Sequence, residues 1–213
     1  MNAPDLSALN TSTLAVFGAL AIMSLLAVTV AFFKVFQFAR MGVGKGRAAE
    51  DILEDWLGGR ADAALSRAAE RRFVLARVLQ SVFSGLRARP DNQEFAEELG
   101  RQTALVELSN MTSRMRVLET VVQAAPILGL LGTVIGMIDA FSTLAGADGA
   151  VDPTQLAGGI WTALTTTAAG LAIALITYFI ATWLEGRIEN ERQSIETLIS
   201  AAIHGRVDAN TPQ

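Results

Sequence analysis

The chain has 213 residues, of which 51% are hydrophobic and 18% are charged, with a formal net charge of −4 and no cysteine. The absence of cysteine excludes disulfides and thiol chemistry, and the charged fraction is below the roughly 25% of soluble domains. The single histidine belongs to no cluster of His, Asp or Glu at metal-ligand spacing, so we expect neither a metal site nor a cofactor.

Three long stretches lack charged residues. They are the intervals between Asp5 and Lys34, between Glu119 and Asp139, and between Asp152 and Glu185. About 20 helical residues cross the roughly 30 Å hydrocarbon core of a bilayer. We therefore predict an all-α integral membrane protein with three transmembrane helices, at 14–33, 119–141 and 156–184.

The basic residues predict the orientation of these spans. All 17 Lys and Arg residues lie in 34–118 or after residue 184. Segments rich in Lys and Arg stay in the cytoplasm. We therefore predict a cytoplasmic helical domain at 34–118 and a cytoplasmic C-terminal helix and tail at 185–213, with the N-terminal segment 1–13 and the loop 142–155 on the outer side.

The segment 34–118 is predicted to be mainly helical. Glycines at 42, 44 and 46 predict a break after the first span, and Gly58-Gly59 predicts a turn. Apolar residues at helical spacing then predict a helix that stops at Pro90; they are Leu75, Leu79, Val82 and Leu86. Asp91, followed by Glu94, is the predicted N-cap of the next helix.

Two long helices are expected to carry spans two and three into the cytoplasm. From Asn92 to Phe141 only Pro126 interrupts the pattern, which predicts one helix of about 50 residues and about 75 Å. The third is predicted to begin near Pro153 and to end at His204, with Gly205 as its stop. Their apolar stripes predict a helical bundle, within or between subunits.

The second span carries small residues on one face. Gly129, Thr133, Gly136 and Ala140 recur at helical spacing, and Gly132 with Gly136 forms a GxxxG pair. Small residues let helices approach closely in lipid, so a packing face is one interpretation and a functional face is another. Pro126 removes one backbone hydrogen bond and is predicted to kink the helix, with or without a gating role.

The third span carries four threonines within six residues, at 162, 165, 166 and 167. Such hydroxyls often bond a carbonyl in their own helix, which is the simplest interpretation of any single one. A cluster of four favours a polar interior. Thr162 and Thr166 share one face, whereas Thr167 points well away from Thr162.

The two spans together carry a resemblance to a known family. The stretch APILGLLGTVIGMIDAF at 125–141, followed by GGIWTALTTTAAGL at 158–171, resembles the ExbB/TolQ/MotA proton-channel family, and its ExbB-like members most. The proline, the glycines, including Gly170, and the threonines fall in the family's order and spacing. The four spans of MotA-like members fit this chain less well.

The resemblance implies a multi-pass protein of the bacterial cytoplasmic (inner) membrane, with the outer segments in the periplasm. It implies a homopentamer around a dimer of a single-span ExbD- or TolR-like partner, with proton flow driving work through TonB or TolA. It places Thr133, Thr162 and Thr167 along the pore, and we add Thr166 from its position in the threonine cluster. Membrane lipids are expected partners, and nucleic acid is not.

One position departs from the family pattern. Many ExbB and TolQ sequences resemble this stretch but have Glu where this chain has Thr162, so the cores of its three spans, at 14–33, 121–138 and 160–184, contain no carboxylate. The titrating carboxylate is therefore expected on the partner. A TolQ-like subunit of the Tol-Pal envelope-maintenance system and a membrane scaffold without an ion path remain alternatives, whereas no set of residues indicates an enzyme.

Overall fold

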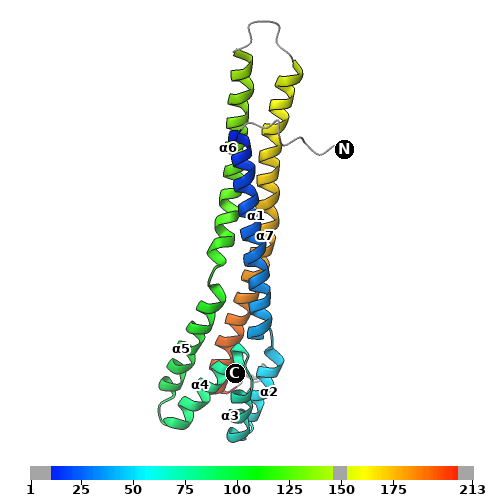
Figure 1. Cartoon of the computed structure of the whole chain (residues 1–213). Helices are drawn as coiled ribbons and strands as arrows, with labels where there is room; N and C mark the ends of the chain where they lie inside the picture. The colour runs from blue at the N-terminus through cyan, green and yellow to red at the C-terminus, as the bar shows by residue number, and fades with distance from the viewer. Residues whose placement is uncertain (1–10, 146–152, 206–213) are drawn as a thin grey trace, which may run out of the picture. The chain divides into compact units, whose positions relative to one another are not determined.

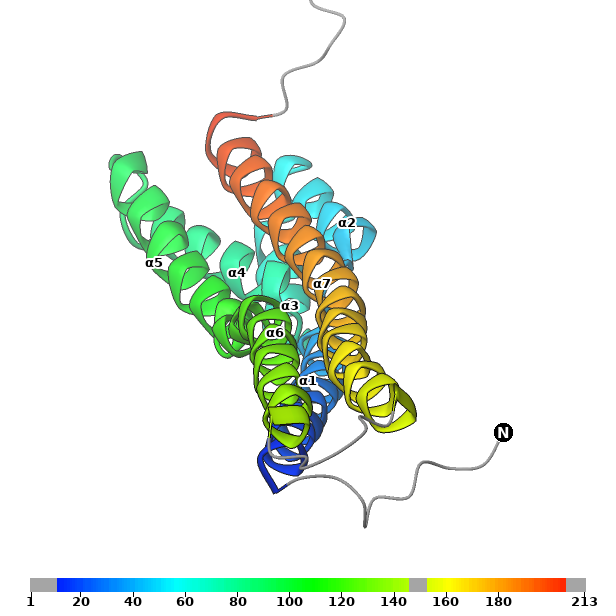
Figure 2. The same cartoon turned by 90° about the horizontal axis from the view of Figure 1, so that it is seen from above.

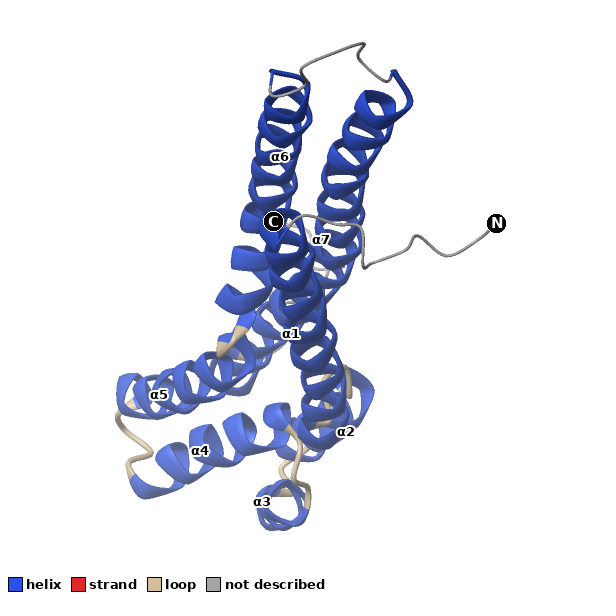
Figure 3. Cartoon of the chain, turned by 45° about the horizontal axis from the view of Figure 1, so that its top comes forward, coloured by secondary structure: helices blue, strands red, loops and turns tan. Residues whose placement is uncertain are grey.

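The computed structural model describes residues 11–145 and 153–205, and within these residues every regular element is a helix (Figures 1 and 3). The all-α prediction is confirmed. In chain order the helices are α1 (Thr11–Met41), α2 (Gly46–Leu57), α3 (Ala61–Glu70), α4 (Val74–Ala88), α5 (Gln93–Thr112), α6 (Met115–Ala145) and α7 (Pro153–His204).

Stretches within α1, α6 and α7 are long and apolar enough to cross a membrane, and they contain the three predicted spans. The predicted N-terminal segment, outer loop and C-terminal tail lie partly outside the described residues, at 1–10, 146–152 and 206–213. The boundaries proposed for the topological segments stay predictions.

The helices form two compact units. The first, here called the apolar unit, consists of residues 11–32, 114–145 and 153–182, so it contains parts of α1 and α7 and all of α6. These three helices run side by side (Figures 1 and 2). Small residues fill their interior, whereas large apolar side chains stay exposed, among them Phe32, Ile127, Ile138, Trp161 and Phe179. Exposed apolar faces of this extent are suited to lipid or to neighbouring membrane helices.

The second, here called the bundle unit, consists of residues 33–113 and 183–205. Its core includes the predicted stripe of α4, because Leu75, Leu79 and Val82 are buried. The ring of Trp56 on α2 stacks on Phe83 of α4 with 4.2 Å between the ring centroids. The apolar stripe predicted for the C-terminal part of α7 is also buried here, at Leu184, Ile188, Ile195 and Leu198.

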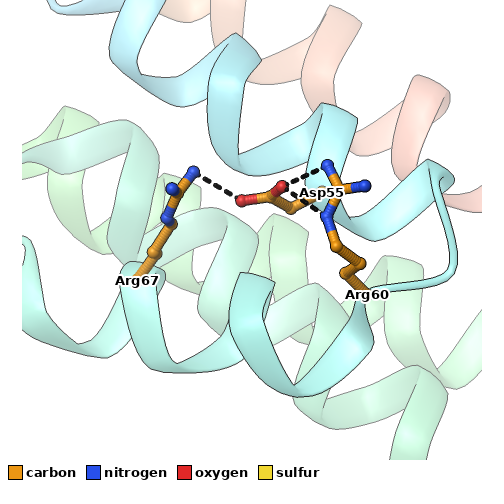
Figure 4. A network of polar contacts seen from close by, with 3 residues as sticks. All are labelled: Asp55, Arg60 and Arg67. Atoms are coloured by element: carbon orange, nitrogen blue, oxygen red, sulfur yellow. Dashed lines mark hydrogen bonds and ion pairs between the residues drawn. The ribbon is translucent and has the colours of Figure 1, made fainter.

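A carboxylate joins α2 to α3 in the bundle unit (Figure 4). Asp55 Oδ1 accepts from Arg60 Nε at 3.0 Å and from Arg60 Nη2 at 2.6 Å, and Asp55 Oδ2 accepts from Arg67 Nη1 at 2.5 Å. The hydrogen bonds from Arg60, opposed by desolvation and assisted by the charge of Arg67, hold the pKa of Asp55 below its ordinary value. This network fixes the turn at Gly58-Gly59.

The predicted glycine turns are confirmed. α1 ends before Gly42, and α2 begins at Gly46, and both Gly42 and Gly44 adopt the left-handed backbone, with φ of 65° and 88°. The predicted N-cap at Asp91 is wrong by one residue. Asn92 is the N-cap of α5, since its side-chain oxygen accepts from the backbone N–H of Phe95 at 2.9 Å.

The predicted continuous helix from Asn92 to Phe141 is wrong. α5 ends at Thr112 and α6 begins at Met115, with Arg114 between them at φ 65°. Hydroxyl side chains near the end of α5 bond local carbonyls, as Ser113 Oγ does with the Asn110 oxygen at 2.8 Å. Such local bonds compete with helical continuation. By contrast, α6 continues through Pro126, and α7 runs unbroken to His204 as predicted.

Candidate functional site

The candidate site is the contact between α6 and α7 in the apolar unit, called here the α6–α7 seam. Small residues form it at steps of three or four along both helices, with Thr167 next to Thr166 as the one adjacent pair. The small residues are Ala125, Gly129, Gly132, Gly136 and Ala140 on α6, and Gly159, Ala163, Thr166, Thr167 and Gly170 on α7.

Backbone approach at the seam requires glycine. A Cβ atom added at Gly129 would lie 2.9 Å from the backbone oxygen of Thr166, and one added at Gly170 would lie 2.5 Å from the backbone oxygen of Ala125. Backbone atoms cannot rotate away as a side chain can. In lipid, close packing of this kind is a principal force that holds helices together.

The same geometry extends along the rest of the seam. A Cβ atom at Gly132 would lie 2.5 Å from Thr166 Oγ1 and 3.0 Å from Val16 Cγ1, so α1 also contacts the seam here. A Cβ atom at Gly136 would lie 2.8 Å from the Cβ of Ala163. The GxxxG pair at Gly132 and Gly136 therefore packs α6 against α7 and α1 of the same chain.

Two threonine hydroxyls cross the seam to a single acceptor. Thr167 Oγ1 donates to the Gly129 carbonyl at 2.8 Å, and Thr166 Oγ1 lies 3.2 Å from the same oxygen and 2.6 Å from the carbonyl of Ala163. Thr166 is fully buried. Because residue 129 has no side chain, α7 comes close enough for Thr166 and Thr167 to reach the Gly129 carbonyl. The same glycine therefore accounts for both the close packing of α6 with α7 and the hydrogen bonds between them.

The other two predicted pore residues bond within their own helices. Thr133 Oγ1 donates to the Leu130 carbonyl at 2.6 Å, and Thr162 Oγ1 donates to the Gly158 carbonyl at 3.0 Å. Both side chains are partly exposed. The structure therefore brings Thr166 and Thr167 together at Gly129 and leaves Thr133 and Thr162 with hydroxyls that a partner helix could reach.

The seam offers hydroxyls and carbonyls but no titrating group. A threonine hydroxyl donates and accepts hydrogen bonds without ionising near neutral pH. In the part of the chain that the structure describes, no three His, Cys, Asp or Glu side chains come together as a metal site would require. The arrangement can stabilise a charged or protonated group brought by another molecule, but it cannot itself carry a proton by titration.

Sequence reasoning missed three members of the seam: Ala125 on α6, and two on α7, Gly159 and Ala163. A Cβ atom at Gly159 would lie 2.8 Å from the Cβ of Ala140. A signal for the two on α7 was present, because Gly159, Ala163, Thr166 and Gly170 follow one another at steps of four, three and four. The pairing of Thr167 with the Gly129 carbonyl had no such signal, since a backbone acceptor on another helix leaves no trace in the side-chain pattern.

Comparison with known proteins agrees with this geometry. The family model of the MotA/TolQ/ExbB proton channel family matches residues 66–197, which contain the whole α6–α7 seam. An ExbB homolog of Methanothermobacter thermautotrophicus is 40% identical over 107 residues, covering 50% of this chain and 37% of that protein. An ExbB-like protein 1 of Synechocystis sp. is 31% identical over 163 residues, covering 76% of this chain and 63% of that protein.

The biopolymer transport protein exbB1 of Vibrio cholerae is 46% identical over 63 residues, covering 30% of this chain and 28% of that protein. The matches to these three relatives therefore cover less than two thirds of each relative's length. The family comprises channel subunits and not enzymes, and the three apolar helices make this chain a multi-pass membrane protein. The chain belongs to the MotA/TolQ/ExbB proton channel family.

Proposed function

We propose that the chain is an ExbB-like subunit of a complex that uses the proton-motive force to drive transport across the outer membrane. One observation carries the proposal beyond family membership: the hydroxyls of Thr166 and Thr167 converge on the Gly129 carbonyl within the uncharged cores of two spans. Polar groups within a span are costly unless they are paired or functional. Each proton that crosses releases about 2.3 kcal/mol per 100 mV of potential.

The proposed assembly is a homopentamer around a dimer of a single-span ExbD- or TolR-like partner, with a TonB- or TolA-like protein as the recipient of the motion. The exposed apolar faces of α1, α6 and α7 supply surface for such contacts, since Trp161 and Phe179 are both exposed. Because the cores of the three spans hold no carboxylate, the proton carrier in this proposal is a carboxylate of the partner. Thr133 and Thr162, which are partly exposed, are its proposed hydroxyl environment together with Thr167.

The proposed location is the inner membrane, with the N-terminus in the periplasm and the C-terminus in the cytoplasm. The distribution of Lys and Arg supports it. The cysteine-free chain allows a direct test with Ala69→Cys and Ala147→Cys, because Ala69 is an exposed residue of α3. A membrane-impermeant thiol reagent outside the cell should label position 147 and spare position 69, and the reverse pattern would reject the orientation.

A TolQ-like role in envelope maintenance is the second candidate, because the same seam would serve either recipient. Deleting the gene separates the two: loss of uptake through TonB-dependent receptors supports the ExbB-like role, and leakage of periplasmic proteins supports the TolQ-like role. A scaffold without an ion path is the remaining candidate. It is favoured only by the bonds that Thr133 and Thr162 make within their own helices.

Valine substitutions of the threonines test the proposed path, because valine keeps the shape of threonine and removes the hydroxyl. Partner-dependent transport is measured in cells for Thr133→Val, Thr162→Val and Thr167→Val at equal expression. We expect slower transport, by about five- to 150-fold for a lost bond to a carboxylate worth about 1–3 kcal/mol. Thr182→Val, outside the threonine cluster, is the control. Wild-type transport in all three variants would reject a role for these hydroxyls.

A further inference from the structure

Glu191 differs from the other buried carboxylates of the bundle unit. Asp55 and Glu107 are buried beside arginines, with Arg77 Nη2 at 2.8 Å from Glu107 Oε2. Glu191 on α7 is only 2% exposed. Among the described residues, no Lys or Arg nitrogen lies within 4.0 Å of its carboxylate. A buried carboxylate without a close cation is a costly arrangement that calls for an explanation.

The two oxygens of Glu191 have different surroundings. Oε2 accepts from the backbone N–H of Gly44, in the turn between α1 and α2, at 2.8 Å. Oε1 is buried and has no hydrogen-bond partner among the described residues. A protonated carboxyl group accepts from the Gly44 N–H through its carbonyl oxygen and buries no carboxylate charge, so burial favours the neutral form.

The backbone of the turn that meets this carboxyl group requires glycine. Gly44 has φ 88°, which glycine adopts without strain and other residues rarely adopt, and a Cβ atom there would lie 2.8 Å from Arg187 Nη2. Arg187 Nη2 donates to the Val43 carbonyl at 3.3 Å. Two residues of the turn thus contact two residues of α7 that lie one helical turn apart, and we call these four residues, Val43, Gly44, Arg187 and Glu191, the turn clasp.

The charged groups around Glu191 are few. Desolvation by burial raises the pKa of Glu191, against the lowering effects of the Gly44 N–H and the charge of Arg187. Lys45, next in the turn, is exposed, with its Nζ 5.9 Å from the ring centroid of Phe73. Desolvation is the largest of these influences, so burial of the charged form is disfavoured relative to burial of the neutral form.

We propose that Glu191 is a proton-binding site that controls the turn clasp, which is closed when the carboxyl group is protonated and opens when it ionises. The direction follows from linkage. A group that binds its proton more tightly in the buried state than in water favours the buried state at low pH and loses that preference as the pH rises. The site is independent of the proposed transport function, because it concerns the bundle unit alone.

Hydrogen–deuterium exchange of the full-length protein in detergent tests the proposal between pH 5 and 8. The amide of Gly44 is the donor of the clasp, so peptides covering residues 42–46 report its opening. After correction for the chemical exchange rate, protection should fall with rising pH, by at most tenfold per pH unit above the ordinary pKa of 4.5, and then level off. Protection that does not change with pH in the wild type would overturn the proposal.

Two variants complete the test. Glu191→Gln keeps the shape and cannot ionise, so its protection at pH 8 should match that of the wild type at pH 5 and should not vary with pH. Glu189→Gln removes an exposed carboxylate two residues away on α7 and should keep the wild-type profile. A pH-dependent profile in Glu191→Gln, or a flat profile in Glu189→Gln, would assign the effect to another group and overturn the proposal.

Discussion

The ammonium group of Lys34 donates a hydrogen bond to the backbone oxygen of Met111 across 2.7 Å, although the two residues are 77 positions apart. Lys34 is fully buried at the end of the first predicted span, and Met111 is the second-last residue of α5. The last carbonyls of a helix have no partner within it, so Lys34 caps α5. Gln37 Nε2 does the same for the Asn110 carbonyl at 3.0 Å.

Lys34→Met should destabilise the bundle unit, because methionine fills a similar volume but leaves the buried Met111 carbonyl without this donor. We expect a loss of about 1–3 kcal/mol in the free energy of unfolding, measured by denaturant titration in detergent. Lys45→Met, at an exposed position, should stay within about 0.5 kcal/mol of the wild type. Equal stability of the two variants would show that the cap is dispensable.

Gly170→Ala should weaken the α6–α7 seam. The added Cβ would lie 2.5 Å from the backbone oxygen of Ala125, which cannot move without displacing α6. Overpacking of this kind costs about 1–3 kcal/mol, so the thermal midpoint in detergent should fall. Gly158→Ala is the matched control on the same helix, since its Cβ would meet nothing within 4 Å. A midpoint for Gly170→Ala at or above that of the control would refute the backbone contact.

The double variant Thr166→Val/Thr167→Val should also weaken the seam, because it removes both hydroxyls that reach the Gly129 carbonyl. Hydrogen bonds between membrane helices contribute about 0.6 kcal/mol each and up to about 1.7 kcal/mol. Thr165→Val is the control, since the Thr165 hydroxyl bonds the Trp161 carbonyl of its own helix. Indistinguishable stabilities in the same unfolding assay would mean that the interhelical bonds contribute nothing measurable.

Asp55 should contribute acid sensitivity to the bundle unit. The hydrogen bonds from Arg60 lower the pKa of Asp55 from 3.8, so its stabilising effect is present above that value and is lost as the pH falls through the lower pKa of the folded state. Asp55→Asn should therefore reduce the dependence of stability on pH below about 4. Asp62→Asn, at the exposed pair with Arg87, should leave it unchanged. An unaltered acid profile in Asp55→Asn would contradict the assignment.

The sequence predicted the elements of this fold better than it predicted their contacts. Runs without charge identified three spans, and glycines with positive φ marked turns, because both signals are local. The break at Arg114 was missed, since part of its cause is the capture of carbonyls near the end of α5 by Lys34 and Gln37, far away in the chain.

In the candidate site, too, the sequence predicted which residues share a helix face but not which contacts they make. Spacing placed Thr162 and Thr166 on one face of α7, yet of these two only Thr166 lies near the Gly129 carbonyl. The register of the two packed helices decides which hydroxyl finds an acceptor on α6. The burial of Glu191 was missed, although spacing places it on the buried stripe of α7, three residues after Ile188 and four before Ile195. The other glutamates of this helix, Glu185, Glu189 and Glu196, lie off the stripe and are exposed.

Proton flux into proteoliposomes tests the central claim most directly. The purified chain is reconstituted alone and with a co-expressed single-span partner, and an internal pH-sensitive dye reports flux under an imposed potential. Because the cores of the three spans, at 14–33, 121–138 and 160–184, contain no carboxylate and no basic side chain, the chain alone should match empty liposomes. The complex should conduct, and should stop conducting when the carboxylate in the partner's span is replaced by an amide. Conduction by the chain alone, or none by the complex, would contradict the account.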